Sequence, residues 1–237
     1  MSKAFKGKTC VYCARVACSS TGDHVFAREF FPKNKRADLP KVPACEACNQ
    51  AKSRLEHYLT AVLPFAGRHA DASSVLNEMV PPRLAKNRRL HAALSASQGR
   101  AWVKQGGMLR PTLTLHLDAQ QFEGLLRYVV RGLVAFHWNT VVPSDYAVGV
   151  AVWTEEGERL ITAALPKRGR AIARATWGDG AFEYEGAQAI DDPHLSIWRL
   201  HLYGGAVLGG DSAGATDTNS RVWVMTSREA VPDLFRY

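Results

Sequence analysis

The sequence contains no apolar run that approaches the roughly 18 residues needed to span a bilayer as a helix. Its first ten residues, MSKAFKGKTC, are basic but no apolar segment follows them, so we expect no secretory signal. Internal repeats and coiled-coil heptads are also lacking. These absences argue against a membrane protein, a secreted protein and a repeat protein. We therefore expect a cytoplasmic protein, in a reducing compartment, without a membrane partner.

Cysteine is scarce, with five residues in 237. In a reducing compartment, paired cysteines favour a bound metal over a disulfide. Two Cys-x-x-Cys pairs supply four thiolates, the tetrahedral set that zinc prefers, although two unrelated or redox pairs are the alternative. The expected ligands of one structural Zn²⁺ are Cys10, Cys13, Cys45 and Cys48. We interpret Cys18 as a small buried hydrophobe rather than a ligand.

Acidic side chains are outnumbered, with 22 Asp and Glu against 30 Lys and Arg, for a net charge of +8. Residues 1–60 hold eleven basic and five acidic side chains, so most of the excess lies there. A concentrated basic region indicates a phosphate-bearing partner, although a solvated, merely solubilising surface would look the same. The candidates for contact with a nucleic-acid backbone are Arg28, Lys33, Lys35, Arg36, Lys41 and Arg54. Arg83, Lys86, Arg88 and Arg89 would extend that surface.

Hydrophobic periodicity predicts an α+β protein. We expect a small metal-bearing N-terminal module over residues 1–65, then a body over 66–237 with helices and a mostly antiparallel β-sheet. Predicted helices are 46–63, two helices in 71–98 broken at Pro81-Pro82, and 119–138 with Asp118 as its cap. Predicted strands are 109–117, 146–153, 170–177, 181–186, 196–205 and 221–227, and 209–220 is a predicted polar loop.

Between the two cysteine pairs, Ser19-Ser20-Thr21-Gly22 predicts a hairpin turn, with Asp23 and His24 at the start of its second strand. Asn49 and Lys52 follow the second pair and lie on one helical face, beside Ser53 and Glu56. If both pairs bind one ion, they must be neighbours. The zinc would then bring Asp23-His24 close to the Asn49 helix.

The order C-x-x-C, D-H-V and C-x-x-C-N-x-x-K resembles the HNH endonucleases of the ββα-metal type, over roughly residues 8–60. The resemblance implies that His24 is the general base for an attacking water. It implies that Asp23 and Asn49 hold one catalytic Mg²⁺ or Mn²⁺ on the scissile phosphate. It also implies that Lys52 binds a phosphate, that the four cysteines bind the structural Zn²⁺, and that the N-terminal module has the ββα-metal fold.

These residue types suit phosphodiester hydrolysis on their own terms. An imidazole titrates near neutrality, and a hard ion on oxygen ligands stabilises the developing negative charge. The sequence departs from the family at one position. The family usually has an asparagine nine residues before the one that matches Asn49, where this chain has Pro40, with Asn34 and Asp38 out of register.

Three hypotheses follow. The first is an HNH endonuclease that hydrolyses DNA, with RNA left open as a substrate. The second is a catalytically inactive zinc module that binds DNA or RNA, and the third is a protein-interaction scaffold. The body carries no motif, and its role in substrate choice, sensing or homo-oligomer formation stays open. His57, two turns beyond Asn49, is interpreted as a solvated side chain.

Overall fold

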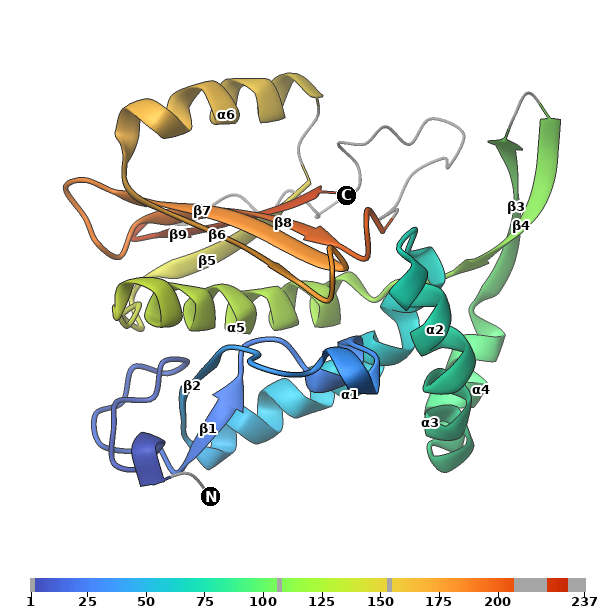
Figure 1. Cartoon of the computed structure of the whole chain (residues 1–237), viewed down its shortest axis with the longest axis horizontal. Coiled ribbons are helices and arrows are strands. Elements are labelled where there is room, and N and C mark those ends of the chain that lie inside the picture. The colour runs from blue at the N-terminus through green and yellow to red at the C-terminus, as the bar shows by residue number, and fades with distance from the viewer. Residues whose placement is uncertain (1–2, 106–107, 153–154, 207–220, 230–237) are drawn as a thin grey trace.

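The computed structural model describes residues 3–105, 108–152, 155–206 and 221–229. Helices and strands are both abundant, so the predicted α+β class is confirmed. The elements form layers: α6 covers one face of a five-stranded sheet, α5 covers the other, and the N-terminal elements pack beneath α5 (Figure 1). The predicted polar loop at 209–220 lies outside the described residues.

The N-terminal elements are β1 (Thr21–His24), β2 (Lys41–Ala44) and α1 (Glu46–Ala66), so two antiparallel strands are followed by a helix. Thr21 and Gly22 belong to β1 and pair with Ala44 and Pro43, so the predicted hairpin turn at Ser19–Gly22 is wrong. Phe5 packs directly on Gly22, and only a residue without a side chain leaves room for this ring. A Cβ at Gly22 would lie 2.3 Å from the Phe5 ring.

Three short helices follow α1 at the right of Figure 1: α2 (Ala70–Glu78), α3 (Val80–Lys86) and α4 (Arg88–Ala96). The predicted break at Pro81-Pro82 is wrong, since the chain breaks at Met79 and both prolines lie in the first turn of α3. Backbone N–H groups in the first turn of a helix have no acceptor within the helix, so a proline there removes no hydrogen bond. The first helix also runs past its predicted end at Leu63, with Pro64 in its last turn.

The hairpin β3 (Gln98–Gln105) and β4 (Met108–Leu115) precedes α5 (Ala119–Trp138). As predicted, Asp118 caps α5, and its Oδ1 accepts a hydrogen bond from Gln121 N at 3.1 Å. The sheet has the antiparallel order β5-β9-β8-β7-β6. Its strands are β5 (Ala147–Ala151), β6 (Gly169–Trp177), β7 (Phe182–Ala189), β8 (Ser196–Leu202) and β9 (Arg221–Ser227).

Helix α6 (Glu155–Arg168) was not predicted from the sequence. Buried Glu158 holds it to the sheet, because one carboxylate oxygen lies 2.9 Å from Arg221 Nη1 and 3.6 Å from Arg199 Nη1. The α6 sequence, EEGERLITAALPKR, contains a glycine and a proline, which weaken the local signal for a helix.

One hydrophobic core joins the N-terminal elements to the sheet. Phe31 packs on Phe182 with ring centroids 5.0 Å apart, and Tyr203 OH donates to Phe30 O at 2.6 Å. Val25 packs so closely on α5 that a Cβ at Gly132 would lie 3.0 Å from it. The predicted domains 1–65 and 66–237 therefore share a core, and the boundary between them falls in the last turn of α1.

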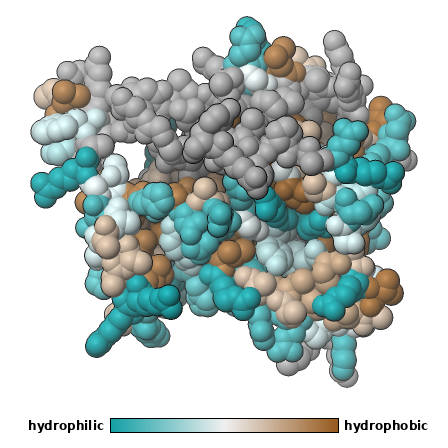
Figure 2. Space-filling model, turned by 180° about the vertical axis from the view of Figure 1, so that it is seen from behind, coloured by the Kyte–Doolittle hydropathy of each residue, from teal (hydrophilic) through white to brown (hydrophobic). Residues whose placement is uncertain are grey.

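The described part of the chain contains no helix that combines the length and the hydropathy of a membrane span. On the face shown in Figure 2, hydrophobic and hydrophilic residues alternate in small patches.

Candidate active site and metal centre

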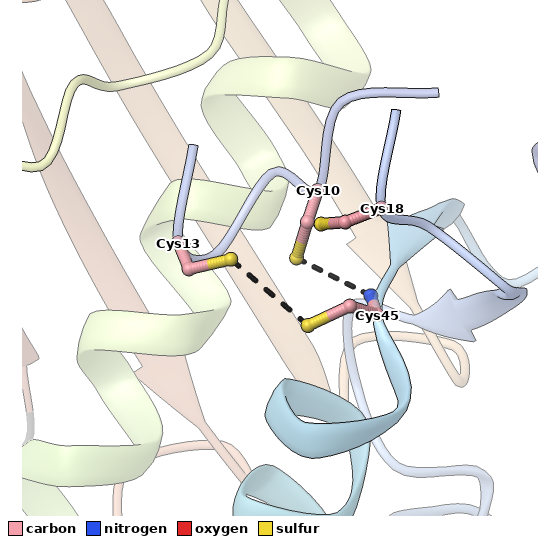
Figure 3. Close-up of side chains that lie close together, drawn as sticks. All are labelled: Cys10, Cys13, Cys18 and Cys45. Carbon is pink, nitrogen blue, oxygen red and sulfur yellow. Dashed lines mark hydrogen bonds between the residues drawn. The ribbon is translucent and has the colours of Figure 1, made fainter. Parts of the chain in front are cut away.

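Four cysteines gather where the N-terminal loop meets the start of α1 (Figure 3). The Sγ atoms of Cys10, Cys13, Cys18 and Cys45 all lie within 4.8 Å of one another, so this cluster could hold a metal ion such as zinc. Four thiolates at about 2.3 Å from a tetrahedral Zn²⁺ would lie roughly 3.8 Å apart. Cys13 Sγ and Cys45 Sγ are 3.9 Å apart, and Cys45 N donates to Cys10 Sγ at 3.3 Å.

The cluster contains one sulfur that the predicted ligand set lacks, that of Cys18. The predicted ligand Cys48 lies beside the cluster, with its side chain within hydrogen-bond reach of Cys13 and Cys45. The loop from Cys10 to Cys18 folds back because Ala14 and Ala17 adopt left-handed conformations, with φ of 58° and 53°. Alanine rarely adopts this conformation. The sequence therefore carries no signal that Cys18 returns to the cluster.

Asp23 and Lys52, predicted to bind a catalytic ion and a phosphate, lie against each other. Lys52 Nζ is 3.0 Å from Asp23 Oδ2, donates to His24 O at 2.7 Å, and donates to Glu56 Oε1. Its side chain is 0% exposed. The ammonium has three donors and three protein acceptors. Lys52 is therefore a buried structural cation, and its predicted role as a phosphate ligand is corrected.

Tyr12 completes this buried network, and sequence reasoning missed it. Its hydroxyl donates to Asp23 Oδ2 at 2.5 Å, and burial raises the Tyr12 pKa well above 10, which keeps the proton on the donor. Glu56 was placed beside Asn49 and Lys52 without a role. Burial raises the pKa of Glu56 to about 7, in spite of the attraction of Lys52. The like charge of Asp23 raises the Glu56 pKa further, although burial is the larger cause.

His24 lies at the end of β1, opposite Lys41 of β2, and is half-buried. Burial lowers the pKa of His24 below 6.5, and the positive charge of Lys41 lowers it further. The backbone on either side of the ring is held by two bonds: Lys52 donates to His24 O, and Val25 N donates to Pro40 O at 2.8 Å. Pro40 thus contributes its carbonyl to this segment at the position where the family usually has asparagine.

Asn49 lies in the first turns of α1 and is half-buried. Within the part of the chain that the structure describes, its side-chain amide makes no hydrogen bond to another group. The same holds for Oδ1 of Asp23 and for the ring of His24. Asp23 and His24 at the end of β1, and Asn49 in the first turns of α1, thus each keep a polar group free for a ligand.

The six basic residues predicted to contact a nucleic-acid backbone differ in their exposure and in their bonding partners. Lys35 lies in two ion pairs, 2.8 Å from Asp71 Oδ1 and 2.9 Å from Asp179 Oδ2, and so ties its loop to α2 and to the β6–β7 turn. Arg36 Nε donates to Phe31 O at 3.0 Å. The remaining four are exposed: Arg28, Lys33, Lys41 and Arg54.

Comparison with known proteins identified no relatives: no protein-family model, no curated protein and no solved structure matches this chain.

Proposed function

We propose that this protein is a metal-dependent endonuclease of the HNH type that hydrolyses DNA phosphodiester bonds. The observation that carries the proposal is the order of elements around the motif. Asp23-His24 ends β1, β2 pairs with it, and α1 begins at a cysteine cluster and carries Asn49. This is the two-strand-and-helix arrangement that the resemblance implies.

In this proposal His24 takes a proton from the attacking water. Its ring makes no hydrogen bond within the described residues, and its lowered pKa leaves it neutral, and thus able to accept a proton, at pH 7. The buried Lys52 acts as a positioning residue, because its bonds to His24 O and Asp23 Oδ2 hold the end of β1 against α1.

A catalytic divalent ion fits the donor types present. Oδ1 of Asp23 and the carboxamide oxygen of Asn49 are the kind of hard oxygen ligands that Mg²⁺ or Mn²⁺ accepts. Such an ion would stabilise the negative charge on the phosphate and on the leaving oxygen. The structural Zn²⁺ is a separate ion, for which the cysteine cluster is the candidate site.

A second candidate function is a catalytically inactive module that binds DNA or RNA. One observation favours it. The Lys52 ammonium lies 3.0 Å from Asp23 Oδ2, so it already neutralises the carboxylate that the ion would need. This candidate predicts salt-sensitive binding to nucleic acid without cleavage.

Plasmid cleavage separates these functions. Wild type, His24→Ala and a control, His91→Ala on the exposed surface of α4, are incubated with supercoiled DNA in EDTA, Mg²⁺ or Mn²⁺. We expect nicking or linearisation that requires the ion, is retained in His91→Ala, and is lost in His24→Ala while zinc content is unchanged. Retardation of the DNA without cleavage would instead support the inactive binding module.

A further inference from the structure

A basic cleft lies between α1 and the short helices that follow it. Its volume is about 610 Å³, and it is lined by Arg54, His57, Met79, Pro82, Arg83, Lys86 and Asn87. None of these described lining residues is acidic, and four have basic side chains. Pro82, Arg83 and Lys86 all come from α3, whereas Arg54 and His57 lie one turn apart on α1.

Arg83 is the most informative residue of this cleft. Its Nη1 is buried and has no hydrogen-bond partner among the described residues. A buried guanidinium nitrogen without an acceptor destabilises the fold, because it has lost its hydrogen bonds to water and has formed none with the protein. Burial accordingly lowers the Arg83 pKa from its usual value, and the positive charge of nearby Arg36 lowers it further.

The surroundings of Arg83 do not compensate its charge. Arg36 reaches the same edge of the cleft, with Nη2 3.6 Å from Met79 Sδ, which is a neutral contact. The charge of Glu29 favours the Arg83 cation, but no ion pair joins the two within the described residues. Basic side chains from two helices thus line one cavity without an acidic residue among its described lining residues, which suits an anion rather than an apolar ligand.

We propose that this cleft binds a phosphate group, with Arg83 as the central ligand and Arg54 and Lys86 on either side. A guanidinium suits a phosphate because two of its N–H groups can bond two oxygens at once. Two sources share this chemistry, the backbone of DNA and a free nucleotide. DNA as the source rests on the proposed nuclease function, whereas the anion site itself does not.

The test is binding in EDTA, where no ion-dependent cleavage occurs. A fluorescent DNA duplex is titrated with wild type, Arg83→Gln, Lys86→Gln and Arg100→Gln, and dAMP and inorganic phosphate are the competitors. Arg100 is the matched control, since it is exposed on β3, does not line the cleft and carries the same charge. Because Nη1 of Arg83 has no partner to lose, Arg83→Gln is expected to fold, and Lys86→Gln changes an exposed side chain.

We expect Arg83→Gln to weaken DNA binding about tenfold, and Arg100→Gln to change it less than about twofold. Lys86→Gln should weaken binding and lower the slope of log affinity against log salt by about one. Displacement of DNA at micromolar dAMP, lost in Arg83→Gln, would identify a nucleotide site. Displacement only by competing DNA would identify the backbone.

Two results would overturn the proposal: equal effects of Arg83→Gln and Arg100→Gln, or no binding of DNA, dAMP or phosphate by wild type. Neither result depends on catalysis. Cleavage with equal Arg83 and Arg100 effects would rule out the cleft as a phosphate site and leave the nuclease function standing. Arg83-dependent binding without cleavage would support the cleft as a phosphate site and rule out the nuclease function.

Discussion

At the scale of single residues, two carboxylates and one ammonium are buried together beside β1, which leaves one excess negative charge. Asp23 and Glu56 face Lys52, and the excess charge is relieved when Glu56 keeps its proton up to about pH 7. Glu56 therefore binds its proton more tightly in the folded chain than in the unfolded chain, where its pKa is near 4.5. This contribution to stability is fully present below pH 4.5 and is lost as the pH rises through 7.

Replacement of Glu56 by Gln should remove this pH dependence. From pH 5 to pH 8 we expect the free energy of unfolding of wild type to fall relative to that of Glu56→Gln, by an amount on the order of 3 kcal/mol. Urea denaturation at intervals of half a pH unit measures the difference, and effects of pH on other groups cancel between the two proteins. Glu78→Gln, at an exposed position of α2, is the control and should follow wild type. Parallel curves for wild type and Glu56→Gln would contradict the raised pKa.

At the scale of elements, the loop from Cys10 to Cys18 decides the composition of the metal centre. Its two left-handed alanines turn the chain back, so that Cys18 joins Cys10, Cys13 and Cys45. Cys48 lies in the first turn of α1, within hydrogen-bond reach of Cys13 and Cys45. The chain thus has five thiols for an ion that takes four, and the four sulfurs that all lie within 4.8 Å of one another include Cys18 and not Cys48.

Single serine substitutions test this choice. We expect Cys18→Ser to weaken zinc binding by more than the roughly 10- to 100-fold that loss of an outer-shell partner costs, and Cys48→Ser to leave it nearly unchanged. Competition with a chelator measures the affinity. In Co²⁺-loaded protein, the thiolate-to-metal absorption should fall only in Cys18→Ser. The opposite ranking would restore the Cys-x-x-Cys pairs as the full ligand set.

At the scale of the whole molecule, the metal-bearing elements and the sheet are expected to unfold together, because they share one core. The bond from Tyr203 OH to Phe30 O joins residues 173 positions apart and is buried. Lys35 adds a second connection by pairing with Asp71 and Asp179.

Tyr203→Phe should lower the free energy of unfolding by about 1–3 kcal/mol, because it leaves the buried Phe30 carbonyl unpaired. Tryptophan fluorescence reports the sheet through Trp198 and Trp223, and Co²⁺ absorption reports the cysteine cluster. We expect both signals to move to the same lower urea midpoint. Tyr58→Phe, whose hydroxyl is partly exposed, is the control with a smaller effect. Separate midpoints for the two signals would show that the N-terminal elements unfold on their own.

Much of the fold follows from local sequence. The strand at 221–227 and the helix at 119–138 have the bounds that their patterns predicted, because alternation and capping are local signals. The presence of α6 was not predictable in this way, because Glu158 is held by Arg199 and Arg221, which lie far along the sequence. The break between α2 and α3 does follow a local rule, since proline is favoured in the first turn of a helix.

The sequence by itself determined that two cysteine pairs flank an Asp-His motif and that an Asn and a Lys follow on one helical face. The spacing of residues along a helix and the ligand preferences of zinc are local properties. Only the tertiary structure decided that Cys18 joins the cluster, that Lys52 is buried between carboxylates, and that Arg83 faces a cleft without a partner. The physical reason is that burial and ion pairing depend on what distant segments bring to a side chain, and residue order does not encode that in any short pattern.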